Sequence, residues 1–275
     1  NLGSVDHLSF TVLATQANGR SKQIGYLNER DLDADLRGNF TLWLSGEKPE
    51  KKGNWVKTGA DAGSGTILVR QYFGNREKEK PATYKIEVVG RKRYDALAPS
   101  TDAEVAAGIR NAHNAIRGLG FLHHYVSPSL GEDENLFKLR NSDDFGADIS
   151  GSDNLYMFGT YHIEEDEALI IETEPLDVRY WNLAIESRWH ESVDYATRRT
   201  HRSLDHAVVD DDGKLRFVLA HGPTPHPNWL DTGGHVEGFM TFRWVGERDS
   251  QLAMPKVTRV KRDDVESTLA ATRAR

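Results

Sequence analysis

The segment DLRGNFTLWL at residues 35–44 indicates the fold class, because its pattern of residues recurs as DDGKLRFVL at residues 211–219. In both segments a turn that contains a glycine, Gly38 or Gly213, leads into a run of recurring apolar side chains. Such a run, bounded by Gly, Asn and Asp, is typical of a short β-strand.

The correspondence continues after both segments. An Asn-Trp pair follows each of them, beginning at Asn54 and at Asn228. Further on, a second apolar run ends at Arg70 and at Arg243. The offset along the chain between the two glycines is nearly the same as that between the asparagines and between the arginines, which predicts an internal repeat. One such unit would leave an apolar face exposed, and pairing two units would bury it.

The sequence therefore predicts a mostly β fold, of the β-sandwich or jelly-roll type and internally duplicated, with one or two covering helices. We expect a single β-rich domain over residues 1–275. Within it we expect a first β unit at 1–98, a helix and a long loop at 99–160, and a second β unit at 161–275.

Individual elements follow from periodicity and turn signals. The pair Thr101 and Glu104 forms a capping-box pattern, and apolar residues at helical spacing continue to Leu119, which predicts a helix that covers an open end or edge. A second, shorter helix is predicted from Trp181 to Ala196. The acidic stretch from Ser127 to Asn154 is rich in Gly, Ser and Asp, which predicts a long loop or lid. Strands are predicted at Phe40–Leu44, Thr66–Tyr72, Tyr84–Val89, Leu215–Leu219 and Phe239–Val245.

Composition limits the classes of function. The chain has 275 residues, a net charge of −7 and 38% hydrophobic residues. The acidic balance argues against a nucleic acid or an anionic membrane as the main partner, and no apolar run approaches the roughly 18 residues of a membrane span. There is no cysteine, which excludes disulfides, thiolate catalysis and Cys-based metal sites. We expect a soluble protein, of the cytoplasm or the periplasm.

Chemistry is predicted in the second unit, because the first unit has no histidine between Gly38 and Arg70. The segment PNWLDTGGH at residues 227–235 is a Gly-rich turn that carries Asp231 and His235. We predict that Asp231 orients His235 as a general base. The alternative is a tight corner in which Asp231 caps backbone amides. The clustered histidines are His190, His201, His206, His221, His226 and His235.

Further candidates complete the predicted site. Tyr195 or His221 would protonate a leaving oxygen, and Arg188 would hold a carboxylate. His221, Asp231 and His235 could form a metal triad, but their spacing matches no known signature, so we predict no metal and no cofactor. The residues predicted to bind the ligand are Trp229, Asn228, Tyr180 and Arg243, although Asn228 and Trp229 have counterparts in the first unit that favour a scaffold role.

Several segments together resemble the family of domains of unknown function numbered 1214. These are Tyr180-Trp181, ESVDY at 191–195, Ala220-His221 and PNWLDTGGH at 227–235. The similarity to longer bacterial members extends upstream through YLNERDL at 26–32 and VRQYF at 69–73.

The resemblance implies a β-sandwich or jelly-roll domain and no settled reaction. The longer members carry a mostly helical segment before the position of Asn1, so we expect such a segment to be missing here. His226 and the preceding GPTP at 222–225 depart from the family pattern, so no role is carried onto His226.

No motif for a nucleophile or a cofactor is present, which favours proton-transfer chemistry. We therefore expect an acid–base enzyme, of lyase or hydratase type, acting on a polar, carboxylated or carbohydrate-like small molecule. The alternatives are a non-catalytic β domain that binds a ligand or a subunit, and a metal-dependent enzyme that uses the histidine cluster. The expected partner is a small molecule or saccharide, with no nucleic acid and no membrane span; a homo-oligomer is left open.

Overall fold

The computed structural model describes residues 1–15, 21–59, 65–90, 99–126, 134–139, 153–246 and 253–273. The predicted fold class is confirmed: the structure is mostly β, with several sheets and two α-helices. The strands are β1 (His7–Thr15), β2 (Ser21–Asn28), β3 (Leu42–Ser45), β4 (Asn54–Lys57), β5 (Gly65–Tyr72), β6 (Leu136–Leu139), β7 (Asn154–His162), β8 (Glu167–Thr173), β9 (Tyr180–Ser187), β10 (His201–Ser203), β11 (Leu215–Ala220), β12 (Trp229–Asp231), β13 (Glu237–Val245) and β14 (Lys256–Lys261). The helices are α1 (Asp102–Val126), the short 3₁₀ helix η2 (Arg262–Asp264) and α3 (Val265–Arg273).

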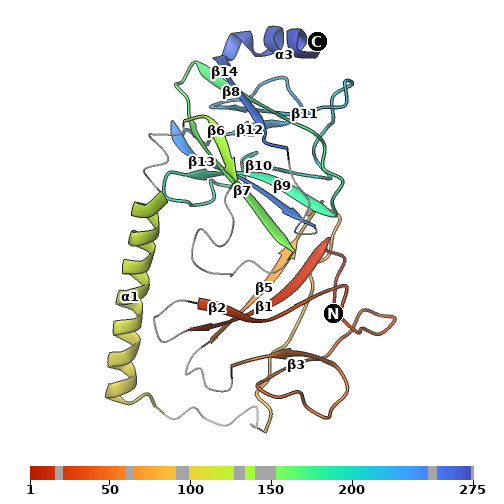
Figure 1. Cartoon of the computed structure of the whole chain (residues 1–275), viewed down its shortest axis with the longest axis vertical. Helices are drawn as coiled ribbons and strands as arrows, with labels where there is room; N and C mark the ends of the chain where they lie inside the picture. The colour runs from red at the N-terminus through yellow and green to blue at the C-terminus, as the bar shows by residue number, and fades with distance from the viewer. Residues whose placement is uncertain are drawn as a thin grey trace.

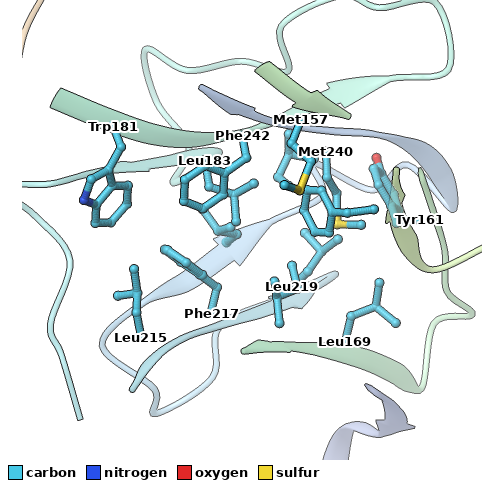
Figure 2. Packing of buried hydrophobic residues seen from close by; sticks show 14 of the residues in the cluster. Met157, Tyr161, Leu169, Trp181, Leu183, Leu215, Phe217, Leu219, Met240 and Phe242 are labelled. Atoms are coloured by element: carbon cyan, nitrogen blue, oxygen red, sulfur yellow. The ribbon is translucent and has the colours of Figure 1, made fainter. Parts of the chain in front are cut away.

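The C-terminal part of the chain is a sandwich of two sheets. A five-stranded sheet, in the order β10-β9-β13-β7-β6, packs on a four-stranded sheet, in the order β12-β11-β8-β14. Their facing side chains form the main core, in which Trp181 stacks on Phe242 and meets Phe217 edge-on (Figure 2). Each large side chain buried in this way stabilises the fold by about 1.5–3 kcal/mol relative to exposure.

The N-terminal part forms a smaller unit below the sandwich in the view of Figure 1. Its three-stranded sheet has the order β2-β1-β5, and β3 and β4 form a separate parallel pair. Leu8 and Phe10 of β1 are buried against Phe40 and Val69, which makes a second core. The two units meet where Tyr72, at the end of β5, stacks on Tyr180 at the start of β9, with ring centroids 5.1 Å apart.

The sheet β2-β1-β5 of the N-terminal unit matches the strands β10-β9-β13 of the C-terminal unit in strand order, pairing direction and register. β1 pairs antiparallel with β2 and β5, and β9 pairs antiparallel with β10 and β13. The pairs β3–β4 and β11–β12 are both parallel. Ser9 lies opposite Arg70 in the first unit, and Asn182 lies opposite Arg243 in the second, so both members of the pair recur at the same offset along the chain.

At each parallel strand pair, an asparagine side chain forms hydrogen bonds with the backbone of neighbouring segments. Asn228 accepts a hydrogen bond at Oδ1 from the Val208 amide (2.8 Å) and donates from Nδ2 to the carbonyls of Val208 (2.7 Å) and Arg216 (2.8 Å). One amide side chain thereby provides hydrogen-bond partners for three backbone groups: the amide and carbonyl of Val208 and the carbonyl of Arg216. Asn54 makes the same three contacts, with the Asp33 amide (2.7 Å), the Asp33 carbonyl (2.9 Å) and the Thr41 carbonyl (3.1 Å).

Two predicted elements are wrong. The segment predicted as a helix from Trp181 to Ala196 begins with strand β9, because its buried residues alternate with a period of two: Trp181, Leu183 and Ile185 face the core. The strand predicted at Tyr84–Val89 is absent; Ile86 and Val88 are exposed there, since no neighbouring strand pairs with the segment. Within the predicted loop Ser127–Asn154 lies β6, while residues 127–133 and 140–152 fall outside the described part of the chain.

The two helices differ in what they cover. The capping box of α1 is present, with the Thr101 amide donating to Glu104 and the Glu104 amide donating to Thr101 Oγ1. The apolar stripe of α1 is nonetheless exposed, and Figure 1 shows the helix standing beside both units. In contrast α3 buries Val265 and Leu269 on the outer side of the four-stranded sheet. Of the described helices, none is both long and apolar enough to cross a membrane.

Candidate functional site

The face of the five-stranded sheet that points away from the core carries polar and aromatic side chains, and we call it the outer face. Residues paired across antiparallel strands lie on the same face of a sheet. Although the core lies on the other side, Phe239, Thr241 and Tyr180 of the outer face are buried. The register gives four rows across β9, β13 and β7: Glu186–Phe239–Thr160, Ala184–Thr241–Phe158, Asn182–Arg243–Tyr156 and Tyr180–Val245–Asn154.

A carboxylate–imidazole pair lies on the first row. Glu186 Oε2 is 3.2 Å from His190 Nδ1, and Glu186 Oε1 accepts a hydrogen bond of 2.6 Å from Thr241 Oγ1. The His190 ring stacks on Phe239, with centroids 3.7 Å apart. A carboxylate at Nδ1 fixes the proton on that nitrogen and leaves Nε2 as the basic atom. His190 Nε2 is buried and has no hydrogen-bond partner among the residues that the structure describes.

The turn after β9 presents this histidine. The Ser187 amide donates to the Glu191 carbonyl (2.9 Å) and the His190 amide donates to the Ser187 carbonyl (3.0 Å), so the chain reverses directly after the strand. His190 has a φ of +60°, which is uncommon for a residue other than glycine. Left-handed backbone at a non-glycine residue costs energy and is often kept at functional sites.

A second cluster surrounds Arg243 on the third and fourth rows. Its guanidinium carbon is 4.9 Å from the ring centre of Tyr156 and 5.6 Å from that of Tyr72. Arg243 Nε is buried without a hydrogen-bond partner, as is Oδ1 of Asn182 directly opposite. Within the described residues no carboxylate forms an ion pair with Arg243. The cluster therefore presents a cation that no carboxylate of the described residues neutralises by an ion pair.

The protonation of this cluster follows from its surroundings. Burial raises the pKa of Tyr180 to about 12, and burial also raises the pKa of Tyr72. Burial alone lowers the pKa of Arg243, but the negative charge that Tyr156, Tyr72 and Tyr180 carry when ionised outweighs it, so that pKa is raised. At neutral pH the guanidinium of Arg243 is therefore charged, and the phenols of Tyr72 and Tyr180 are neutral.

The residues predicted as the catalytic set do not form the predicted arrangement. Asp231 binds Arg198 Nη1 (3.0 Å) and accepts a hydrogen bond from the Gly233 amide (2.8 Å), and no hydrogen bond joins it to His235. The reason is the turn itself: Gly233 and Gly234 both have a positive φ, which brings the Gly233 amide onto Asp231 and leaves His235 exposed. Asp231 thus accepts a hydrogen bond from a backbone amide in a tight corner, which is the alternative interpretation of this turn.

The remaining predicted residues are scattered. His221 uses both ring nitrogens, with Thr232 Oγ1 at 2.7 Å and the Ile163 carbonyl at 3.0 Å. Tyr195 is exposed, and Arg188 pairs with Glu237 at 2.9 Å. Trp229 is partly buried beneath Arg199, and Asn228 fastens β11 to β12. Of the predicted residues, Tyr180 and Arg243 lie together on the outer face.

Sequence reasoning missed five residues of the outer-face clusters: Glu186, Thr241, Asn182, Tyr156 and Tyr72. It named His190 as one of the clustered histidines but gave it no role of its own. The sequence carries a signal for Thr241 in β13, where Phe239, Thr241 and Arg243 alternate with the core residues Met240 and Phe242. The matching alternation in β9 is obscured by the helix predicted over the same segment.

The histidine cluster does not gather into a metal site. Across the described ranges, the group of three His, Asp or Glu side chains with ligand atoms within 4.8 Å of one another is Asp6, Glu79 and Asp205, at the junction of the two units. Burial and the neighbouring Glu79 and Asp205 raise the pKa of Asp6.

The chain is similar in structure to proteins that have been solved without a known function. An uncharacterised protein from Burkholderia cenocepacia, known from a crystal structure, is 27% identical, with a TM-score of 0.84 over 95% of this chain and 71% of that one. The VPA0106 protein from Vibrio parahaemolyticus is 11% identical, with a TM-score of 0.49 over 94% of this chain and 85% of that one. No protein-family model and no curated protein matches the chain.

Proposed function

We propose that the protein is an acid–base enzyme, of lyase or hydratase type, which acts on a polar small molecule at the outer face with His190 as its general base. The observation that carries this proposal is the pair of His190 and Glu186: one ring nitrogen is held by a carboxylate, and the other is buried and free. A base oriented in this way contributes a rate factor of about 10²–10⁴ in proton-transfer reactions.

The reaction that fits this pair begins with a C–H proton of the substrate. The proton moves to His190 Nε2, and Glu186 stabilises the imidazolium that forms. The electron pair left on carbon forms a double bond and expels a hydroxyl group from the adjacent carbon. That group takes the abstracted proton from the imidazolium of His190 and leaves as water, so the base is regenerated and the reaction needs no oxidant and no co-substrate.

Two wider proposals accompany the function. We propose that the two β units arose by duplication, which the matching strand order and register support. Membership of the family of domains of unknown function numbered 1214 also stays a proposal, which rests on the motifs quoted above.

The test is turnover of a panel of hydroxy acids and sugar acids, followed by the vinylic proton signals of the product in proton NMR. We expect His190→Gln to lower kcat by at least about 100-fold, a loss far larger than the modest drop in melting temperature that follows from losing the contacts of the ring with Glu186 and Phe239. His235→Gln is the matched control, since His235 is exposed and should leave kcat unchanged. Full activity of His190→Gln would overturn the assignment of the base. Tight binding by the wild type without any turnover would instead favour a non-catalytic ligand-binding domain.

A further inference from the structure

We infer that Arg243 forms a separate subsite for a carboxylate, and that the substrate is an elongated acid whose carboxylate lies far from the carbon that loses its proton. This inference rests on the proposed function of His190, and it adds the class of substrate. Four observations on the outer face support it.

The first observation is the missing counter-charge of Arg243. Arg216 shows how this chain treats a buried guanidinium: its nitrogens bind Glu172, Asp210 and Asp212, each at 2.7 Å. Arg243 instead contacts the rings of Tyr156 and Tyr72, and its Nε is buried without a partner. A buried charge is costly unless it is paired, so an anion at this place would stabilise the folded protein.

The second observation is the counterpart of Arg243 in the N-terminal unit. Arg70 occupies the same register position and donates from Nη1 to Thr11 Oγ1 (2.8 Å). An arginine at this strand position can therefore find an oxygen acceptor within the protein, as Arg70 does.

The third observation is what surrounds the guanidinium. Asn182, directly opposite, donates from Nδ2 to the Tyr180 hydroxyl (3.1 Å) and carries no charge; its Oδ1 can accept a hydrogen bond from a hydroxyl group of the substrate but does not bind the carboxylate. Because the guanidinium is planar, stacking on aromatic rings leaves its N–H groups free to bind the two oxygens of a carboxylate. The phenols of Tyr72 and Tyr180, whose pKa values burial raises, add no negative charge that would repel such a ligand.

The fourth observation is the distance between the two clusters. Phe239, which carries the His190 ring, and Arg243 are four residues apart on β13. At about 3.4 Å per residue of an antiparallel strand, their Cα atoms lie roughly 13 Å apart. An arginine side chain can shorten this span by a few ångströms, and a carboxylate of two or three carbons is too short to bridge it. Between them Thr241 is buried, and Phe158 opposite it on β7 is partly buried, so the middle of the substrate would contact the ring of Phe158.

The test is calorimetric binding of matched probes: 4-hydroxycinnamate, its uncharged amide, and the shorter 4-hydroxybenzoate. For the wild type we expect the long carboxylate to bind more tightly than either of the other two. Arg243→Met should weaken binding of 4-hydroxycinnamate at least tenfold and leave binding of the amide unchanged. Arg70→Met is the matched control and should bind all three probes as the wild type does.

A second variant keeps the test decisive if Arg243→Met fails to fold. Asn182→Asp places a carboxylate opposite the guanidinium, so it should raise the melting temperature and weaken binding of 4-hydroxycinnamate. Unchanged carboxylate binding in both variants would overturn the inference, as would equal affinity for the acid and the amide, or no binding of 4-hydroxycinnamate at millimolar concentration.

The two proposals can fail separately. Loss of turnover in His190→Gln together with normal carboxylate binding in Arg243→Met would retain the base and remove the subsite. The reverse pattern, weakened binding in Arg243→Met with full turnover in His190→Gln, would retain the subsite and overturn the proposed function.

Discussion

At the scale of single residues, Arg216 shows how charge is buried in the second β unit. Its side chain is 1% exposed, and three carboxylates on three sides neutralise it. Hydrogen bonds from Arg216 lower the pKa of Asp212 to about 2. Removing one partner of a buried ion pair leaves the others uncompensated, which costs more than the pair itself contributes.

We predict that Arg216→Met lowers the free energy of unfolding at pH 7 by about 3 kcal/mol. The wild type should also lose stability as the pH falls from the ordinary aspartate pKa of about 3.9 toward 2, because Asp212 binds a proton more readily when unfolded. The variant should show a flatter pH dependence in this window. Urea unfolding at pH 7, 5 and 3 measures both effects.

Lys85→Met is the control for this experiment, because it removes an ion pair with Glu87 in which both side chains are exposed. Exposed pairs contribute at most about 1 kcal/mol. Equal losses in the two variants at pH 7 would contradict the view that burial sets the importance of Arg216.

At the scale of elements, the two helices show that a regular apolar pattern does not by itself predict burial. α1 carries Ile109 at 66% and Ile116 at 71% exposure, whereas Leu269 of α3 is fully buried. Both stripes follow helical spacing, and the difference lies in the neighbours: Ala168, Ile170 and Val218 provide α3 with a matching surface on the four-stranded sheet.

We expect the double variant Ile109→Gln, Ile116→Gln to keep the melting temperature of the wild type, because neither side chain is buried in the folded chain. Leu269→Ala should instead destabilise the protein by about 2–4 kcal/mol through the cavity it leaves. Thermal unfolding followed by circular dichroism at low protein concentration compares them. A large loss in the α1 variant would mean that this stripe has a partner in solution.

At the scale of the whole molecule, the sequence predicts the fold class better than the site. The mostly β character follows from local alternation and turn residues, which the chain carries in its own order. Which strands are neighbours in a sheet does not follow from the local sequence. For example, β13 lies between β9 and β7, and this pairing depends on the packing of distant segments. The helix predicted in place of β9 is wrong because a short apolar run fits both periods.

The site escaped prediction for the same reason. His190 pairs with Glu186 through a turn whose left-handed backbone leaves no mark in composition. Tyr72 reaches Tyr180 and Arg243 from the other β unit, a contact between segments far apart in the sequence. The Asp231 and His235 motif is visible in the sequence, but its glycines turn the two side chains apart.

The asparagine that fastens each parallel strand pair has a consequence for amide hydrogen exchange. The amides of Asp33 and Val208 belong to exposed residues outside the strands, yet each donates to an asparagine side chain. We expect both to exchange with deuterium far more slowly than their loop neighbours. In Asn54→Ala the amide of Asp33 should lose this protection while that of Val208 keeps it, which amide-resolved NMR would show. Two surface loops would then be as slow to open as the sheets they adjoin.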